Sequence, residues 1–113
     1  MPQEIKEQIL NRLTERVPLH KVIVFGSHAA GTAGADSDID LIVVTDDDYM
    51  PATYEENMAY YLNVASALRE MRKTIAVDLI VHTRTMHEKF IGLGSMFSRE
   101  ILETGEVLYE KSD

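Results

Sequence analysis

The sequence predicts an α/β (α+β) fold, a small mixed sheet flanked by helices, and three observations lead to it. Short β-branched runs alternate along the chain with segments whose apolar residues recur at helical spacing. The 113 residues are enough for one domain that buries about two-thirds of its unfolded surface. No internal repeat or low-complexity linker divides them. We therefore expect one domain over residues 1–113, with elements in the order α-β-α-β-α-β-α.

The chain begins with an expected helix and an expected strand. Residues 3–16 are apolar at helical spacing, and Pro18 ends this helix because proline cannot continue it. Residues 21–25 form a short β-branched run that Gly26 bounds. This composition is typical of a buried strand.

The middle of the chain carries a brief helix, a central strand and a long helix. Residues 27–33 can form the brief helix, with Ser27 as its N-cap. After Asp40, residues 41–44 are apolar on both faces of the expected strand 39–44, so we expect this strand in the centre of the sheet. Residues 54–71 place apolar side chains on one helical face.

The C-terminal part adds the third strand and a broken helix. Residues 76–81 form the strand, and residues 86–104 are helical but interrupted by two glycines. Gly105 can stop the last helix, and residues 107–109 can add a short edge strand.

Composition narrows the classes of partner. The formal charge is −8, from 11 Lys and Arg against 19 Asp and Glu. Such a surface repels nucleic acid, and the basic cluster Arg69, Arg72 and Lys73 lies where a helix should end, which is a common place for cations. We expect a small substrate or a protein partner, with a homo-oligomer left open.

The remaining bulk features point to the cytoplasm. No run of about 18 apolar residues is present, so we expect no membrane span. The charged N-terminus lacks the apolar centre of a signal peptide. The absence of cysteine excludes disulfides and thiolate metal sites.

The stretch from Gly26 to Leu41 carries most of the chemistry. Gly26-Ser27 ends the first strand, and ten residues later Asp38-x-Asp40 opens the next. A glycine-bearing turn lets backbone N–H groups approach phosphate, and paired carboxylates bind the metal ions that accompany triphosphates. Ser37, directly before the Asp-x-Asp, is a further candidate for the nucleotide site with Gly26 and Ser27.

The aspartates indicate a metal site. Asp38 and Asp40 are two apart on a strand and project from one face, so they repel each other unless a cation lies between them. Asp78 interrupts an otherwise apolar run and joins them if the third strand neighbours the second. Oxygen ligands of this kind suit Mg²⁺ or Mn²⁺, and three carboxylates meet the needs of two-metal phosphoryl transfer.

This combination resembles the minimal nucleotidyltransferases of the DNA polymerase β superfamily. The resemblance rests on Gly26-Ser27, Asp38-x-Asp40 and Asp78, and extends to residues 101–109, so it covers almost the whole chain. It implies a mixed sheet flanked by helices, Mg²⁺ dependence, and transfer of a nucleoside monophosphate from ATP or another nucleoside triphosphate.

Many small members of this family resemble the antitoxin half of a two-gene module. Its partner is a helical HEPN ribonuclease toxin, and AMP is transferred from ATP to a toxin tyrosine. Members often carry arginines where this chain has His28 and Ala30. The sequence does not identify the nucleotide base or the acceptor.

Three readings of function remain open at this stage. The first is a Mg²⁺-dependent nucleotidyltransferase acting on a partner protein, with Asp38, Asp40 and Asp78 as catalytic and metal-binding residues. The second is a catalytically weak or inactive antitoxin that acts by binding its partner. The third is nucleotidylation of a small molecule of the aminoglycoside kind. An apolar patch of Met86, Phe90, Met96 and Phe97 would suit protein docking.

Overall fold

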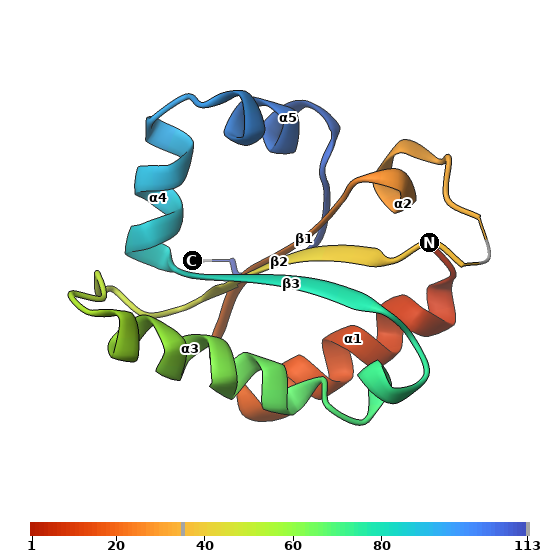
Figure 1. Cartoon of the computed structure of the whole chain (residues 1–113), viewed down its shortest axis with the longest axis horizontal. Helices are drawn as coiled ribbons and strands as arrows, with labels where there is room; N and C mark the ends of the chain where they lie inside the picture. The colour runs from red at the N-terminus through yellow and green to blue at the C-terminus, as the bar shows by residue number, and fades with distance from the viewer. Residues whose placement is uncertain (35, 113) are drawn as a thin grey trace.

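A four-stranded mixed sheet forms the centre of the computed structural model, which describes residues 1–34 and 36–112. The strands are β1 (Leu19–Phe25), β2 (Ile39–Thr45), β3 (Val77–Thr83) and β4 (Glu106–Glu110). Their order is β3-β2-β1-β4 (Figure 1), with β1 antiparallel to β2 and β4, and β2 parallel to β3. The predicted fold class, the central place of β2 and the edge strand β4 are confirmed.

The larger core lies on the face of the sheet that α1 (Gln3–Arg16) and α3 (Tyr54–Ala67) cover (Figure 1). Ile9 and Leu13 of α1 and Val64 of α3 are fully buried there, against apolar side chains of the strands. Burial of each such side chain stabilises the fold by about 1.5–3 kcal/mol. The helix α3 also serves as the crossover that parallel strands β2 and β3 require.

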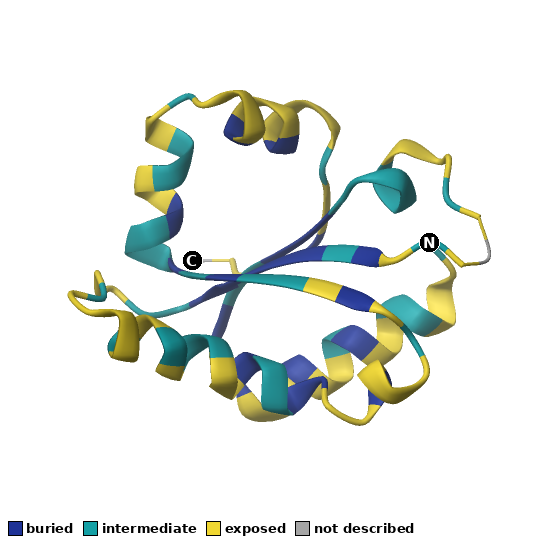
Figure 2. Cartoon of the chain, viewed as in Figure 1, coloured by how far each residue is buried: buried dark blue, intermediate teal, exposed yellow. Residues whose placement is uncertain are grey.

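The opposite face carries α4 (Arg84–Gly92) and α5 (Met96–Thr104), and its core is thinner. Its buried apolar residues are Ile23, Ile42, Val44 and Ile101, against which Phe25, Ile80 and Phe90 pack. Figure 2 shows that most of α5 is exposed while the strands beneath are buried. This lightly covered face also carries the even-numbered residues of β2 and β3, including both predicted strand aspartates.

Two local predictions were wrong. Ser27 does not cap α2 (Ser27–Ala30); Gly26 occupies the N-cap, with no side-chain capping bond. The long helix ends at Ala67 rather than near Met71, which lies in the short 3₁₀ helix η1 (Met71–Lys73). Both helix types bring residues three apart to one side, so apolar spacing alone cannot distinguish them.

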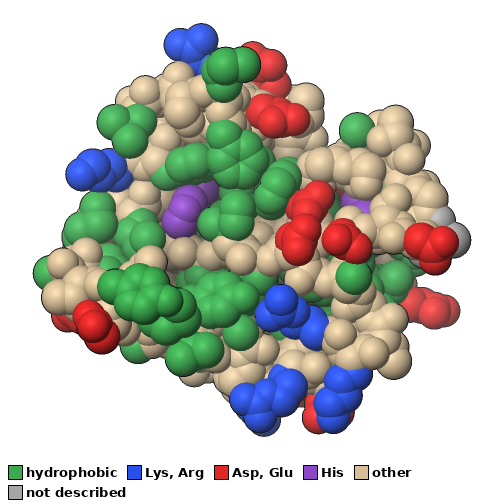
Figure 3. Space-filling view, viewed as in Figure 1, with side chains coloured by type: hydrophobic (Ala, Val, Ile, Leu, Met, Phe, Trp, Pro, Cys, Tyr) green, Lys and Arg blue, Asp and Glu red, His purple; other side chains and the backbone are tan. Residues whose placement is uncertain are grey.

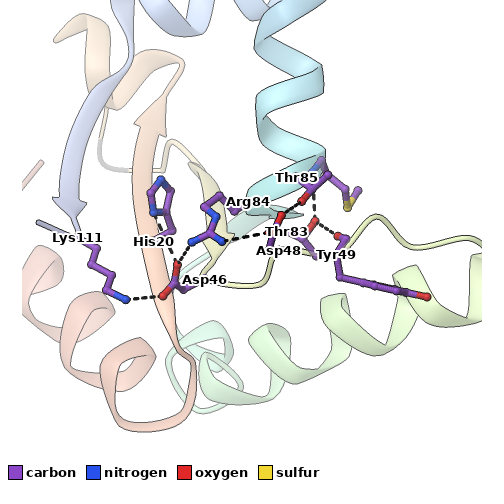
Figure 4. A network of polar contacts seen from close by, with 9 residues as sticks. His20, Asp46, Asp48, Tyr49, Thr83, Arg84, Thr85 and Lys111 are labelled. Atoms are coloured by element: carbon purple, nitrogen blue, oxygen red, sulfur yellow. Dashed lines mark hydrogen bonds and ion pairs between the residues drawn. The ribbon is translucent and has the colours of Figure 1, made fainter. Parts of the chain in front are cut away.

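An ion-pair network joins the far ends of the strands (Figure 4). Arg84 donates to Oδ1 of Asp46 at 2.7 Å, and Nζ of Lys111 donates to its Oδ2 at 2.5 Å. The N–H of Asp46 bonds to the carbonyl of Pro18 at 2.8 Å. Asp46 therefore ties the end of β2 to the start of α4 and to the residue after β4.

Within the described ranges, none of the helices combines the length and the hydropathy that crossing a bilayer would take.

Candidate active site

Asp40 and Asp78 are brought together by the register of the two parallel strands. Asp40 on β2 is the direct partner of Asp78 on β3, and both project from the α4/α5 face of the sheet. Asp40 is half-buried, whereas Asp78 is exposed. The third strand does neighbour the second, which was the condition for Asp78 to join the other aspartates, and this pairing places the two carboxylates side by side.

Asp38 lies just outside the strand. It precedes Ile39, the first residue of β2, and its side chain is exposed. Its negative charge still acts on Asp40, whose pKa it helps to raise. All three predicted aspartates therefore lie at one end of the sheet, close enough to interact electrostatically.

The pKa of Asp40 is raised above its ordinary value. The largest cause is burial of the carboxyl group, and the next causes are the negative charge of Asp78 and a hydrogen-bonding contact with that residue. His28 acts in the opposite direction but more weakly. Because crowded carboxylates disfavour their ionised forms, a cation or a proton between them lowers the free energy of the site.

Gly26 is the part of the turn that touches the aspartates. Its φ of 72° and ψ of −149° lie in a region that is essentially restricted to glycine. A Cβ at this position would overlap Oδ2 of Asp40. The glycine therefore lets the end of β1 pass against the carboxylate, with α2 starting directly after it.

Two polar side chains near the turn are engaged within their own loop. The hydroxyl of Ser37 accepts from the N–H of Gly34 at 2.9 Å, and Nε2 of His28 lies 3.2 Å from the carbonyl of Ser37. The N–H groups of Ser27 and His28 begin the helix, where no carbonyl of the same helix can receive them. The roles of Gly26, Ser27 and Ser37 in nucleotide binding stay predictions.

The donor set fits a hard divalent cation. Across residues 1–34 and 36–112, no group of three or more His, Cys, Asp or Glu side chains is already arranged as metal ligands. The adjacent carboxylates of Asp40 and Asp78 would nevertheless offer oxygen ligands to such a cation, and Mg²⁺ or Mn²⁺ between them would relieve their mutual repulsion.

One histidine pair was not anticipated. Nδ1 of His82 lies 3.1 Å from Nδ1 of His87, and the ring of Phe90 packs against His82 at 5.1 Å between centroids. The pKa of each ring is lowered, mainly because the ring is buried, and the pKa of His87 falls to about 4. Strand alternation in the sequence puts His82 on the same face as Asp78. Only the tertiary structure shows that α4 packs over His82.

The electrostatic surface around the site is mixed. Figure 3 shows acidic side chains grouped near the place where β2 and β3 begin. Lys and Arg side chains lie below them, over the C-terminal end of α3 and over η1. The basic residues of that region are Arg69, Arg72 and Lys73, of which Lys73 pairs with Glu70 at 3.1 Å.

Sequence comparisons find proteins that are similar to this chain. The profile of the family described as "Polymerase beta, Nucleotidyltransferase" matches residues 7–113. A Methanocaldococcus jannaschii protein named "Putative protein adenylyltransferase" is 31% identical over 91 residues, which cover 80% of this chain and 79% of that protein.

Solved structures share the fold. A toxin–antitoxin crystal structure with AMP-PNP has a TM-score of 0.61 and 22% identity, covering 95% of this chain and 74% of that one. A mutant of the MntA–HpeT toxin–antitoxin gives a TM-score of 0.55 at 21% identity, with coverage of 95% and 74%. At this identity the likeness concerns the fold.

Proposed function

The chain belongs to the polymerase β nucleotidyltransferase family and is a nucleotidyltransferase, and from this premise we propose that it transfers AMP from ATP to a partner protein with Mg²⁺ or Mn²⁺. The observation that carries the proposal is the pairing of Asp40 with Asp78 across parallel strands, directly against Gly26. The acceptor side is supported by the name of the 31% identical relative. The partner we propose is a toxin, because two structures of the same fold are toxin–antitoxin structures. Its assignment to the HEPN class rests on the family resemblance of the sequence.

In this proposal Asp38, Asp40 and Asp78 would hold the metal, and the chemistry it would supply there is neutralisation of charge on the triphosphate and activation of the acceptor hydroxyl. Gly26 keeps side-chain bulk away from the phosphates, and the N–H groups that begin α2 face them together with Ser27. The acceptor oxygen bonds to the α-phosphorus as the bond from that phosphorus to the bridging oxygen breaks. Pyrophosphate leaves, and the acceptor proton passes to a carboxylate or to water.

The test uses ATP labelled at the α-phosphate, Mg²⁺ and the product of the neighbouring reading frame. Label should move to that protein, and transfer should fall at least 100-fold in Asp38→Asn, Asp40→Asn and Asp78→Asn. Glu15→Gln is the control, because it removes an exposed carboxylate of α1 on the other side of the sheet. Transfer that survives the aspartate changes would refute the assigned roles.

A second candidate function is neutralisation of the partner by binding alone. It is favoured by the position of His28, whose Nε2 is already engaged by Ser37, and by Ala30, which offers no cation to a triphosphate. The Asp38→Asn variant discriminates between the two functions in cells that express the partner. Protection that persists without transfer supports binding alone, and protection that is lost supports catalysis.

A further inference from the structure

Directly behind the paired aspartates, the α4/α5 face of the sheet becomes apolar. Residues two apart on a strand project from the same face, so Ile42 follows Asp40 on β2 and Ile80 follows Asp78 on β3. Ile42 is fully buried, and Ile80 packs against the same small core. Figure 3 shows hydrophobic side chains that adjoin the acidic group. The carboxylates therefore border an apolar floor.

Three phenylalanine rings meet beside this floor. Phe25 ends β1 and is the register partner of Asp40, and such antiparallel partners have Cα atoms about 4.5–5.5 Å apart. The ring of Phe97, on α5, lies 5.4 Å from that of Phe25 and 5.6 Å from that of Phe90, on α4, between centroids. Both contacts are T-shaped, an arrangement that aromatic pairs prefer. The three rings thus hold one another in place next to Asp40.

Phe97 keeps open surface although two rings contact it. It is 36% exposed, whereas Phe25 and Phe90 are half-buried. None of the three lines the hollow of about 440 Å³ that lies farther along the sheet, between α4, α5, β1 and β4. A ring that its neighbours already hold loses little further freedom when a ligand stacks on it. The open part of Phe97 is therefore a preorganised aromatic surface near the carboxylates.

A nucleobase is the aromatic group that the substrate brings to this site, because the chain is a nucleotidyltransferase. Bases stack on aromatic side chains whatever their hydrogen-bonding pattern, since every base has a π-face. Another hollow near the aspartates, of about 300 Å³, is lined by Ser37, Ile39 and Ile5. Ile39 belongs to the core under α1 and α3, and Ile5 lies on α1. That hollow thus lies toward the opposite face, whereas Phe97 shares the face of Asp40 and Asp78.

We propose that the exposed ring of Phe97 is the surface on which the purine base of the nucleotide stacks. The inference rests on the proposed function for the place of the phosphates, at Gly26 and the start of α2. Phe25 directly precedes Gly26 and contacts Phe97, so a nucleotide whose phosphates lie at Gly26 has its base within reach of Phe97. Stacking strengthens with ring area, so this surface favours purines over pyrimidines.

Phe97→Trp reports on the contact directly. The chain contains no tryptophan, so this change introduces a single indole, whose emission is quenched when a base stacks on it. With Mg²⁺ present, AMP-PNP should quench the emission saturably, and tripolyphosphate, which has no base, should leave it unchanged. Tyr54→Trp is the control, because Tyr54 is an exposed ring of α3 on the other face of the sheet, and its emission should not respond to AMP-PNP.

Calorimetry with AMP-PNP and Mg²⁺ measures what the ring contributes. Phe97→Leu keeps an apolar side chain against Phe25 and Phe90 but removes the ring, and it should weaken AMP-PNP at least fivefold, as loss of one stacked base does. Phe97→Tyr keeps the ring and should bind within twofold of the wild type, as should Tyr54→Leu.

Tripolyphosphate separates stacking from folding. Its affinity should be the same in Phe97→Leu as in the wild type, because it makes no contact with the ring. The wild type should also bind AMP-PNP more tightly than the corresponding cytidine analogue, and Phe97→Leu should reduce that preference. Equal weakening of AMP-PNP and tripolyphosphate, an unchanged affinity for AMP-PNP in Phe97→Leu, or no binding of AMP-PNP by the wild type would overturn the proposal.

The transfer assay distinguishes this inference from the proposed function. Phe97→Leu should raise the KM for ATP at least fivefold and leave kcat within twofold, the pattern of lost uniform binding. If no label reaches the acceptor while AMP-PNP binding depends on Phe97, the proposed function is refuted and the stacking surface stands. If transfer proceeds and the KM for ATP is unchanged in Phe97→Leu, the stacking surface is refuted and the function stands. A raised KM for the acceptor with an unchanged KM for ATP would identify an acceptor side chain as the occupant and refute the proposal.

Discussion

Gly26 gives the sharpest prediction, because replacement by alanine perturbs both the backbone and the site. Its φ of 72° with ψ of −149° is strained for any residue with a Cβ, at a cost of about 1–3 kcal/mol. The new Cβ would also overlap Oδ2 of Asp40, so the carboxylate or the turn must move. We expect Gly26→Ala to lower the free energy of unfolding by at least that strain and to lower AMP transfer more than 100-fold.

Urea unfolding and the labelled-ATP transfer assay measure the two effects separately. Gly92→Ala is the matched control: Gly92 ends α4, and a Cβ there meets no atom within 4 Å. That change should leave transfer intact and stabilise the fold by about 0.4–1 kcal/mol, because alanine restricts the unfolded chain. A Gly26→Ala protein as stable and as active as the wild type would show that the turn does not press against Asp40.

Three further predictions follow from particular side chains. The raised pKa of Asp40, due first to burial, means that the folded state binds this proton more tightly than the unfolded chain, so its contribution to stability falls as the pH rises above 3.8. In chelator at pH 7, Asp40→Asn should therefore be more stable than the wild type by a few tenths to about 1 kcal/mol, and urea titrations near pH 3 should show no such gain. The pKa of Asp46 is lowered, first by its hydrogen bond from Lys111, so its stabilisation is present at pH 7 and is lost as the pH falls below 3.8. Thermal melts should show a lower Tm for Asp46→Asn at pH 7 and a narrowing difference below pH 4; a constant difference would contradict this. Ile42→Ala empties a fully buried position and should cost about 2–5 kcal/mol in urea unfolding, whereas a loss below 1 kcal/mol would mean that the core around it collapses to fill the space.

The predictable parts of the fold are those with a local signal. Apolar spacing located α1 and most of α3, and β-branched runs located the first three strands, because side-chain periodicity follows directly from helix and strand geometry. The 3₁₀ helix η1 was missed because Met71 is buried there as it would be in a continuing α-helix. The cap of α2 was misassigned because serine is a common N-cap, whereas a glycine with positive φ has no side chain to signal its role.

Other features depend on residues far apart in the chain. Asp46 pairs with Lys111, 65 residues away in the sequence, and with Arg84, 38 residues away. No local sequence pattern predicts such pairs. The hollow between α4, α5, β1 and β4 likewise depends on how two short helices pack over the strands. Residues of both helices and both strands line it, Leu102 and Val107 among them, and only the structure brings these together.

The sequence by itself indicated which residues form the predicted site, because Gly26-Ser27, Asp38-x-Asp40 and Asp78 each carry a local constraint on backbone or charge. A glycine ends a strand, two carboxylates share a face, and a third interrupts an apolar run. What only the tertiary structure decided is the distance between these pieces. Strand order and direction follow from the packing of α3 and the shared core, and the parallel pairing of β2 with β3 sets Asp78 beside Asp40.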